Sequence, residues 1–260
     1  MGSQSSLYYN DNDPYCAQWV RNLWPEAEVD SRSVELVKPE DVAGYTRCHF
    51  FGGILGWEHA LNLAGWGDAE VWTASLPCQP FSTAGKRKGT SDDRHLWPIF
   101  RDLVDQSRPP IIFGEQVASK AGREWLAAVR IDLEALGYAV GAADLCAGSV
   151  GAPHVRQRLF WGAANASMHG CQGLQRSSQA QVPKDRTPQA LDAWHGTGNP
   201  FEHWSQFLAE SYVQRVDDGV SSTVDIRPRL HAYGNAIVPQ VAAQFISSFL
   251  EVIADLPTQV

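Results

Sequence analysis

The chain has 260 residues, 44% of them hydrophobic and 19% charged, and a net charge of −8. This composition excludes a disordered chain and favours one full-sized domain with a small appendage. No apolar run approaches the roughly 18 residues of a membrane span, residues 1–6 lack a signal-peptide pattern, and the five cysteines form no C-x-x-C pair. We therefore expect a soluble intracellular protein that uses no membrane, no metal and no disulfide framework.

A strand followed by a helix opens the chain. The apolar run at 7–9 predicts the strand, which ends in a polar turn. Asp13 then offers an acceptor that can cap a helix beginning at Pro14, because proline tolerates the first helical position. Three large residues recur every four positions along this helix and predict its buried face: Tyr15, Trp19 and Leu23.

Strands and helices continue to alternate up to residue 164. Further strands are expected at 45–51, 71–74, 111–113, 139–143 and 159–161. Helices are expected at 57–64, 96–104 and 121–136, and a final one at 238–254. This order predicts an α/β fold with a doubly wound, mostly parallel sheet. Ligands of such sheets bind beyond the carboxyl ends of the strands, where we expect the loops 10–13, 52–56, 76–94 and 114–119.

Composition changes after residue 164. Residues 165–230 are rich in Gln, Ser, Gly, Pro and His and show little periodicity, which predicts a small irregular insert. Residues 1–164 and 231–260 would then form the main domain. Positive charge gathers in 81–95 and 151–164, so a nucleic acid could meet a locally basic surface despite the negative net charge.

The loop after the strand at 71–74 carries a cysteine close to positive charge. Cys78 stands between two prolines and shortly before the basic run 86–88. Nearby cations lower the pKa of a thiol and so favour the nucleophilic thiolate. The ordinary alternative is an inert cysteine in a rigid turn. The segment 77–82, Pro-Cys-Gln-Pro-Phe-Ser, argues against that alternative, because it resembles the nucleophile motif of the DNA (cytosine-5)-methyltransferase family.

Three later segments resemble the same family in the same order. Residues 113–117 resemble its Glu-Asn-Val element, with Gln116 in the place of asparagine. Residues 151–158 resemble its Gln-x-Arg-x-Arg element, with His154 in the place of glutamine, and 234–238 resemble its Gly-Asn-x-Val element. Each segment alone has an ordinary structural explanation, but their order after the cysteine motif favours the family.

This resemblance implies a Rossmann-like, S-adenosylmethionine-dependent methyltransferase whose insert recognises the target sequence. Cys78 would attack carbon 6 of a cytosine flipped out of duplex DNA, and Glu115 would protonate or hydrogen-bond ring nitrogen 3. Arg158 would bind the cytosine carbonyl oxygen, and Arg156 would hold the catalytic loop or a phosphate. The methyl group goes to carbon 5 and leaves S-adenosylhomocysteine. DNA contacts are expected at Gln79, Ser82, Lys86, Arg87, Lys88 and Arg94.

The cofactor half departs from the usual plan of the family. Residues 50–57 resemble its glycine loop, but Leu55 stands in the place of one glycine. A G-x-G-x-x-G fingerprint is not present, which argues against an NAD enzyme. Residues 9–15 resemble the acidic strand end that holds the cofactor ribose in the family. In this chain the ribose and adenine segments therefore come before the glycine loop, which is a rearranged order.

Two carboxylates carry the expected cofactor contacts. Asp11 would accept from the ribose hydroxyls, and Asp30 would accept from the adenine amino group. If Asp11 does not hold the ribose, Glu70, which lies near the next strand, is the alternative ribose ligand. The cofactor residues implied by the resemblance are Asp11, Asn12, Asp30, Phe51, Gly52, Gly53, Ile54, Gly56, Trp57, Pro77, Asn235, Ala236 and Ile237.

Two other functions stay open at this point. The family includes a tRNA-modifying branch, so RNA cytosine-5 methylation by the same chemistry is the nearest alternative. A catalytically weak DNA- or cofactor-binding relative is the other, and Leu55, Gln116 and His154 motivate it. The resemblance otherwise implies a monomeric cytoplasmic enzyme, bacterial or phage-encoded, that acts on intracellular duplex DNA, with restriction-modification as one setting.

Overall fold

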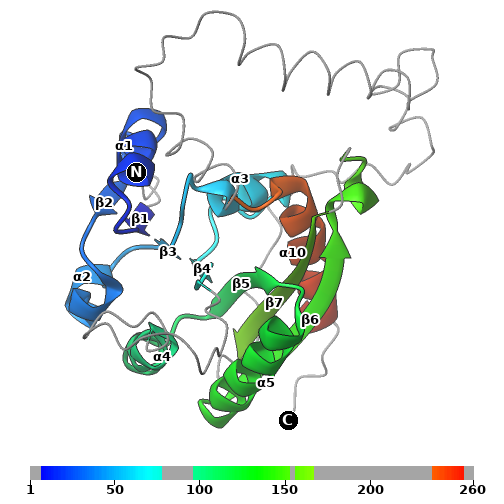
Figure 1. Ribbon diagram of the computed structural model, residues 1–260. Helices are drawn as coiled ribbons and strands as arrows, with labels where there is room; N and C mark the ends of the chain where they lie inside the picture. The colour runs from blue at the N-terminus through cyan, green and yellow to red at the C-terminus, as the bar shows by residue number, and fades with distance from the viewer. Residues whose placement is uncertain (1–6, 78–95, 153–155, 167–235, 255–260) are drawn as a thin grey trace, which may run out of the picture.

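The computed structural model describes residues 7–77, 96–152, 156–166 and 236–254 (Figure 1). Its centre is a seven-stranded sheet with the order β2-β1-β3-β4-β5-β7-β6. The strands are β1 Leu7–Asn10, β2 Glu28–Asp30, β3 Arg47–Phe50, β4 Val71–Ala74, β5 Ile111–Val117, β6 Tyr138–Cys146 and β7 Gln157–Asn165. The helices are α1 Pro14–Leu23, α2 Pro39–Val42, α3 Gly56–Leu63, α4 Leu96–Ser107, α5 Lys120–Ala135 and α10 Pro239–Ala254, with short 3-10 turns η1 Val34–Leu36 and η3 Ala147–Val150.

The sheet is mostly parallel, as predicted. Strands β2, β1, β3, β4 and β5 pair in parallel, whereas β7 runs antiparallel to both β5 and β6. Helices cover both faces, so the doubly wound α/β class is confirmed. Figure 1 shows α4 and α5 on the opposite side of the sheet from α3 and α10.

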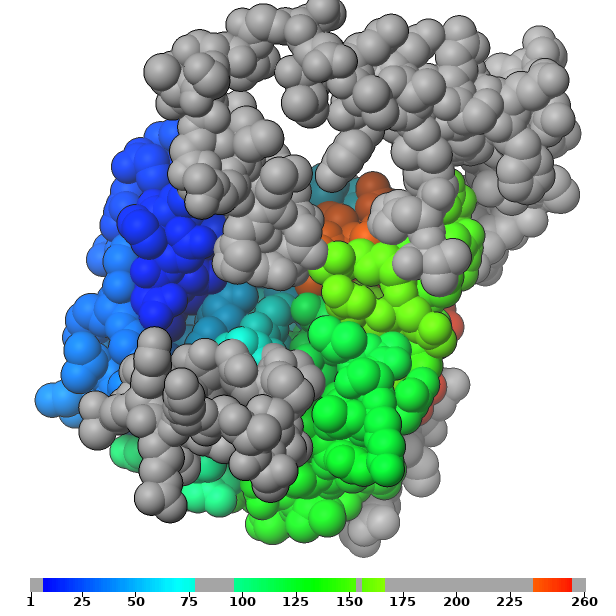
Figure 2. Space-filling model, viewed as in Figure 1, coloured from blue at the N-terminus to red at the C-terminus, as the bar shows by residue number. Residues whose placement is uncertain are grey.

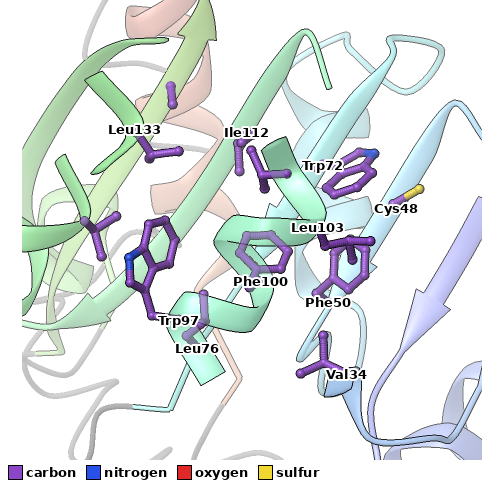
Figure 3. Packing of buried hydrophobic residues seen from close by; sticks show 14 of the residues in the cluster. Val34, Cys48, Phe50, Trp72, Leu76, Trp97, Phe100, Leu103, Ile112 and Leu133 are labelled. Atoms are coloured by element: carbon purple, nitrogen blue, oxygen red, sulfur yellow. The ribbon is translucent and has the colours of Figure 1, made fainter. Parts of the chain in front are cut away.

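Aromatic packing fixes α4 to one face of the sheet. Phe100 is fully buried, and its ring centroid lies 5.1 Å from that of Phe50 on β3 and 6.2 Å from that of Trp72 on β4. Figure 3 shows Phe100 between the helix and these strands, with Leu103 beside it. Removing such a ring typically costs about 3–5 kcal/mol.

A second cluster covers the other face. The ring of Phe113 on β5 stacks on Trp57 of α3 at 6.4 Å and meets Phe249 of α10 edge-on at 5.4 Å. A third, smaller cluster lies beneath α1 and contains Leu7, Tyr9, Ala17, Val20 and Leu55. The helix that starts at the glycine loop is therefore held by packing from two directions.

The predicted buried face of α1 is wrong. The buried residues are Cys16, Ala17 and Val20, whereas Leu23 is 53% exposed. Ala17 and Val20 pack in the cluster that also contains Leu7 and Tyr9 of β1. Tyr15 and Trp19 instead pack on each other at the edge of the helix, with ring centroids 6.4 Å apart.

Strands β5, β6 and β7 are longer than predicted. β5 continues to Val117, so Glu115 and Gln116 belong to the strand and not to a loop at 114–119. The ladder with β7 explains this extension, because it pairs Ile111 with Ala164 and continues to Val117 with Arg158. Apolar residues mark only the middle of such a strand.

The predicted insert at 165–230 lies outside the described residues, apart from Asn165, where β7 ends, and Ala166. The division into two parts therefore stays a prediction. Among the described residues, no helix is both long and apolar enough to cross a membrane.

Candidate active site

One edge of the sheet collects most of the described site residues. In the parallel strands β1, β3, β4 and β5 the last paired positions lie in one row: Asn10, Phe50, Ala74 and Gly114. The residues that follow them are Asp11, Phe51, Ser75 and Glu115; three of these are candidates, and the Ser75 hydroxyl accepts from the candidate Trp57. Four segments that are far apart in sequence thus meet at the carboxyl edge, where doubly wound sheets bind ligands. In Figure 2 the blue N-terminal residues lie on the left of the molecule and the green residues from the middle of the chain lie on the right.

The glycine loop at 51–56 has an unusual backbone. Phe51, Gly53 and Leu55 all have positive φ, of 51°, 52° and 61°. Glycine adopts this region without penalty, but Leu55 pays a steric cost of about 1 kcal/mol. Its side chain is fully buried, which offsets that cost and explains how leucine can replace a glycine here.

The ring of Tyr9 packs so closely against the loop that position 52 requires glycine. A Cβ on Gly52 would lie 2.6 Å from the ring of Tyr9, so no larger residue fits. Beside Gly53, in contrast, no atom of the described residues lies within 4 Å of the position that a Cβ would take. The loop is thus supported from beneath and open beside Gly53.

Asp11 lies directly against this loop. One carboxylate oxygen accepts from the backbone N–H of Gly53 at 2.8 Å, and the other accepts from the N–H of Asp13 at 2.9 Å. Asn12 is exposed beside it.

Asp30 is already bonded within the protein. Its carboxylate accepts from the Tyr8 hydroxyl at 2.6 Å and forms an ion pair with Arg32 at 2.7 Å. Burial alone would raise the pKa of Asp30, but the hydrogen bonds from Arg32 and Tyr8 lower it to about 2. Both of these contacts go to Oδ2, and Oδ1 accepts from the backbone N–H of Arg32 at 2.9 Å, so both oxygens have partners. The contact of Asp30 with adenine stays a prediction.

Glu70 is wrong as a replacement for Asp11. It immediately precedes β4, so it lies at the amino end of a strand whose carboxyl end leads to Pro77. The length of the strand separates Glu70 from Asp11.

The remaining candidates of the cofactor half divide into supports and exposed groups. Trp57 is 1% exposed and donates to the Ser75 hydroxyl at 2.9 Å, so it ties α3 to the end of β4. Ile237 packs on the loop end, because a Cβ on Gly56 would lie 2.8 Å from its Cγ1. Ile54 and Ala236 are half-buried, whereas Pro77 is exposed.

Glu115 and the two arginines come together where β5 and β7 pair. Arg158 Nε lies 3.4 Å from Glu115 Oε2, a buried oxygen without a hydrogen-bond partner in the described structure. Burial raises the pKa of Glu115, while the charges of Arg158 and Arg156 oppose the rise. A carboxyl group held in this way can donate a proton at a pH where an exposed one cannot.

Gln116 has a role that the sequence did not reveal. Its amide Nε2 donates to the backbone carbonyl of Leu76 at 3.3 Å, and its Oε1 accepts from the N–H of Val117 at 2.9 Å. The side chain therefore holds β4 where it leads toward Cys78. Glutamine in the place of the family's asparagine keeps an amide side chain at this position. That retained amide was the only feature of the sequence that could have indicated the contact.

A buried polar network under the glycine loop was also missed. Glu58 of α3 accepts from Arg47 Nε at 2.9 Å and lies 3.1 Å from His49 Nε2, and His49 Nδ1 lies 2.7 Å from the Thr73 hydroxyl. These groups join α3 to β3 and β4. Arg47 and His49 share one face of β3 because they are two positions apart, but nothing in the sequence indicates that Glu58 of α3 packs on that face.

Several candidates lie outside the described residues. These are Cys78, Gln79, Ser82, Lys86, Arg87, Lys88, Arg94, His154 and Asn235. Within the described ranges, no group of three or more His, Cys, Asp or Glu side chains could hold a metal ion.

Comparison with known proteins identifies the family. Residues 58–212 match the family model described as C-5 cytosine-specific DNA methylase. The chain belongs to this family. The match begins in α3 and includes β4, β5, β6 and β7, and the candidates Glu115 and Arg158 lie within it.

The curated members of the methylase family that this chain resembles are longer. The chain is 38% identical over 162 residues to the Type II methyltransferase M.AplI of Arthrospira platensis, covering 62% of this chain and 45% of that protein. It is 30% identical over 165 residues to the Type II methyltransferase M.AgeI of Thalassovita gelatinovora, covering 62% of this chain and 35% of that protein. The chain thus matches less than half the length of each.

Among solved structures, that of the S. pombe Dnmt2 methyltransferase aligns with 95% of this chain and 99% of its own, at 14% identity and a TM-score of 0.48.

Proposed function

We propose that the protein is a DNA cytosine-5 methyltransferase that methylates carbon 5 of a cytosine flipped out of duplex DNA. Family membership supports this class. The observation that carries the proposal is Glu115, a buried carboxyl group with a raised pKa, 3.4 Å from Arg158 and on the strand next to the one that leads to Cys78. A polar base edge could complete the bonding of the Glu115 oxygen that has no partner.

S-adenosylmethionine is the methyl donor that fits the cofactor half. The Asp11 carboxylate stands at a strand end beside the glycine loop, and a carboxylate is the kind of acceptor that binds vicinal hydroxyls. The open space beside Gly53 leaves room for a ligand at the same place. When bound, S-adenosylmethionine would supply an electrophilic methyl group.

Carbon 5 of cytosine is a poor nucleophile, so the residues of the chain must activate it. The Cys78 thiolate would form a bond to carbon 6, while Glu115 gives a proton or hydrogen bond to ring nitrogen 3. Arg158 would hold the carbonyl oxygen of the base. After methylation of carbon 5, a base would remove the proton there, and the sulfur–carbon bond breaks to release the Cys78 thiolate.

DNA recognition would fall to segments outside the described structure. The loop with Gln79, Ser82, Lys86, Arg87, Lys88 and Arg94 supplies positive charge for phosphates, and 165–230 would read the bases. We propose that Arg156 supports the catalytic loop or a phosphate. We also propose that the protein acts as a monomer on intracellular DNA.

Methyl transfer with labelled cofactor tests the function. We expect label in duplex DNA, and digestion of the product to nucleosides should give 5-methylcytosine. Label in tRNA with none in DNA would make the protein an RNA methyltransferase instead. Label in neither, from a protein that binds S-adenosylmethionine, would favour the catalytically weak relative.

A further inference from the structure

We infer that Tyr9 is a positioning residue for the glycine loop at 51–56, and that it raises the affinity for S-adenosylmethionine by orienting Gly53. The inference rests on the proposed function, since it assigns a role at the same cofactor site. Tyr9 lies on β1, about forty positions before the loop it contacts.

Two contacts join Tyr9 to the loop. Its hydroxyl donates to the carbonyl oxygen of Gly53 at 2.6 Å, and its ring lies directly beneath Gly52. The side chain is fully buried, and burial together with the nearby Asp11 charge raises its pKa, so the phenol keeps its proton and remains a donor.

Gly53 is consequently held at both of its polar backbone groups. Its carbonyl accepts from Tyr9, and its N–H donates to Asp11, the proposed ribose ligand, at 2.8 Å. The residue itself has a φ of 52°, and among the described residues nothing lies within 4 Å of the position that a Cβ would take, so these two hydrogen bonds, and not packing by the described residues, fix the direction of its polar groups. Tyr9 and Asp11 together set the orientation of Gly53 and, through it, the position of the ribose carboxylate.

Leu55 anchors the end of the loop to the same unit. Its side chain is buried in the cluster that contains Leu7, Tyr9, Ala17 and Val20, residues of β1 and α1. This side-chain anchor adds to the backbone bonds between β1 and β3 and to the bond from the N–H of Gly52 to the carbonyl of Asn10 at 3.4 Å. A loop held in this way loses less conformational freedom when a ligand binds.

The experiment compares Tyr9→Phe with a matched control, Tyr138→Phe. Tyr138 is also buried and also donates its hydroxyl to a backbone carbonyl, that of Pro109 at 2.8 Å, but it lies on the edge strand β6. Calorimetric titration with S-adenosylmethionine and with S-adenosylhomocysteine measures Kd directly. For Tyr9→Phe we expect Kd and KM to rise about three- to tenfold with kcat nearly unchanged, the effect of one neutral hydrogen bond. For Tyr138→Phe we expect Kd to stay within about twofold of wild type.

Hydrogen exchange supplies a second measurement on the same variants. Amides at 51–56 should exchange faster in Tyr9→Phe than in wild type, and at wild-type rates in Tyr138→Phe. Unchanged Kd and unchanged exchange in Tyr9→Phe, with wild type binding the cofactor, would overturn the inference alone. Equal effects in both variants would show a general loss of stability and also overturn it. No binding by wild type would overturn the proposed cofactor and the inference together.

Discussion

At the scale of single residues, Glu115 links catalysis to a cost in stability. Because burial raises its pKa in the folded protein, it stabilises the fold below its unfolded pKa, and this contribution is lost as the pH rises through the folded value. At pH 7 the fold therefore holds a carboxyl group that would be more stable in water. A neutral amide avoids that cost but supplies no proton.

Glu115→Gln should accordingly lower turnover by about two orders of magnitude or more while leaving the free energy of unfolding at pH 7 equal to or above that of wild type. Methyl transfer and urea denaturation measure the two quantities. Glu124→Gln is the control, because Glu124 is an exposed carboxylate on α5. Loss of activity that merely follows loss of stability would contradict the assigned role.

Asp11 and Asp13 allow a second test at this scale. Asp13 caps α1 by accepting from the N–H of Tyr15 at 2.8 Å, as predicted from the sequence, whereas Asp11 contacts the glycine loop. Asp11→Ala should weaken S-adenosylmethionine binding about ten- to a hundredfold, since charge-assisted hydrogen bonds are worth about 1.5–3 kcal/mol. Asp13→Ala should cost about 1 kcal/mol of stability and little affinity. Calorimetry and thermal denaturation separate the two, and unchanged affinity in folded Asp11→Ala would remove Asp11 from the site.

At the scale of elements, the buried network of Arg47, His49 and Glu58 fixes α3 against the sheet. Arg47 and Glu58 have side chains only 7% and 4% exposed. Glu58→Leu would deprive a buried guanidinium of this counter-charge, so we expect a loss of about 3–5 kcal/mol. The double variant Arg47→Met, Glu58→Leu should recover much of that loss, because neither charge then remains.

Chemical denaturation measures these differences. Glu134→Leu serves as control, because Glu134 pairs with Arg130 on the exposed surface of α5, where an ion pair contributes at most about 1 kcal/mol. If Glu58→Leu cost no more than Glu134→Leu, the network would not hold α3 in place.

The elements also show what the sequence could and could not predict. β4 was predicted at its exact limits, because a short apolar run between a turn and Pro77 has one interpretation. β5 was predicted too short, because its end is defined by pairing with β7, and that pairing is a long-range property. The face of α1 was wrong because small residues, not large ones, contact the sheet.

At the scale of the whole molecule, the strand order explains how residues of the first thirty positions join the candidate site. β1 lies between β2 and β3, so Asp11 lies against the glycine loop and Asp30 lies one strand further out, although the loop follows both in sequence. Local motifs indicated these residues. The hydrogen bond from Gln116 to Leu76 and the hydrogen bond from Tyr9 to Gly53 depend on how the strands align in the sheet, so only the structure shows them.

The central claim is that Cys78 forms a covalent bond to a flipped cytosine at this edge of the sheet. Duplex DNA containing 5-fluorocytosine tests it most directly, because fluorine at carbon 5 cannot leave as a proton does and the adduct persists. With S-adenosylmethionine present, wild type should give a protein–DNA species that survives denaturation, whereas Cys78→Ser should bind the cofactor normally and give none. An active wild type that traps no DNA, or an equal adduct with Cys78→Ser, would contradict the account.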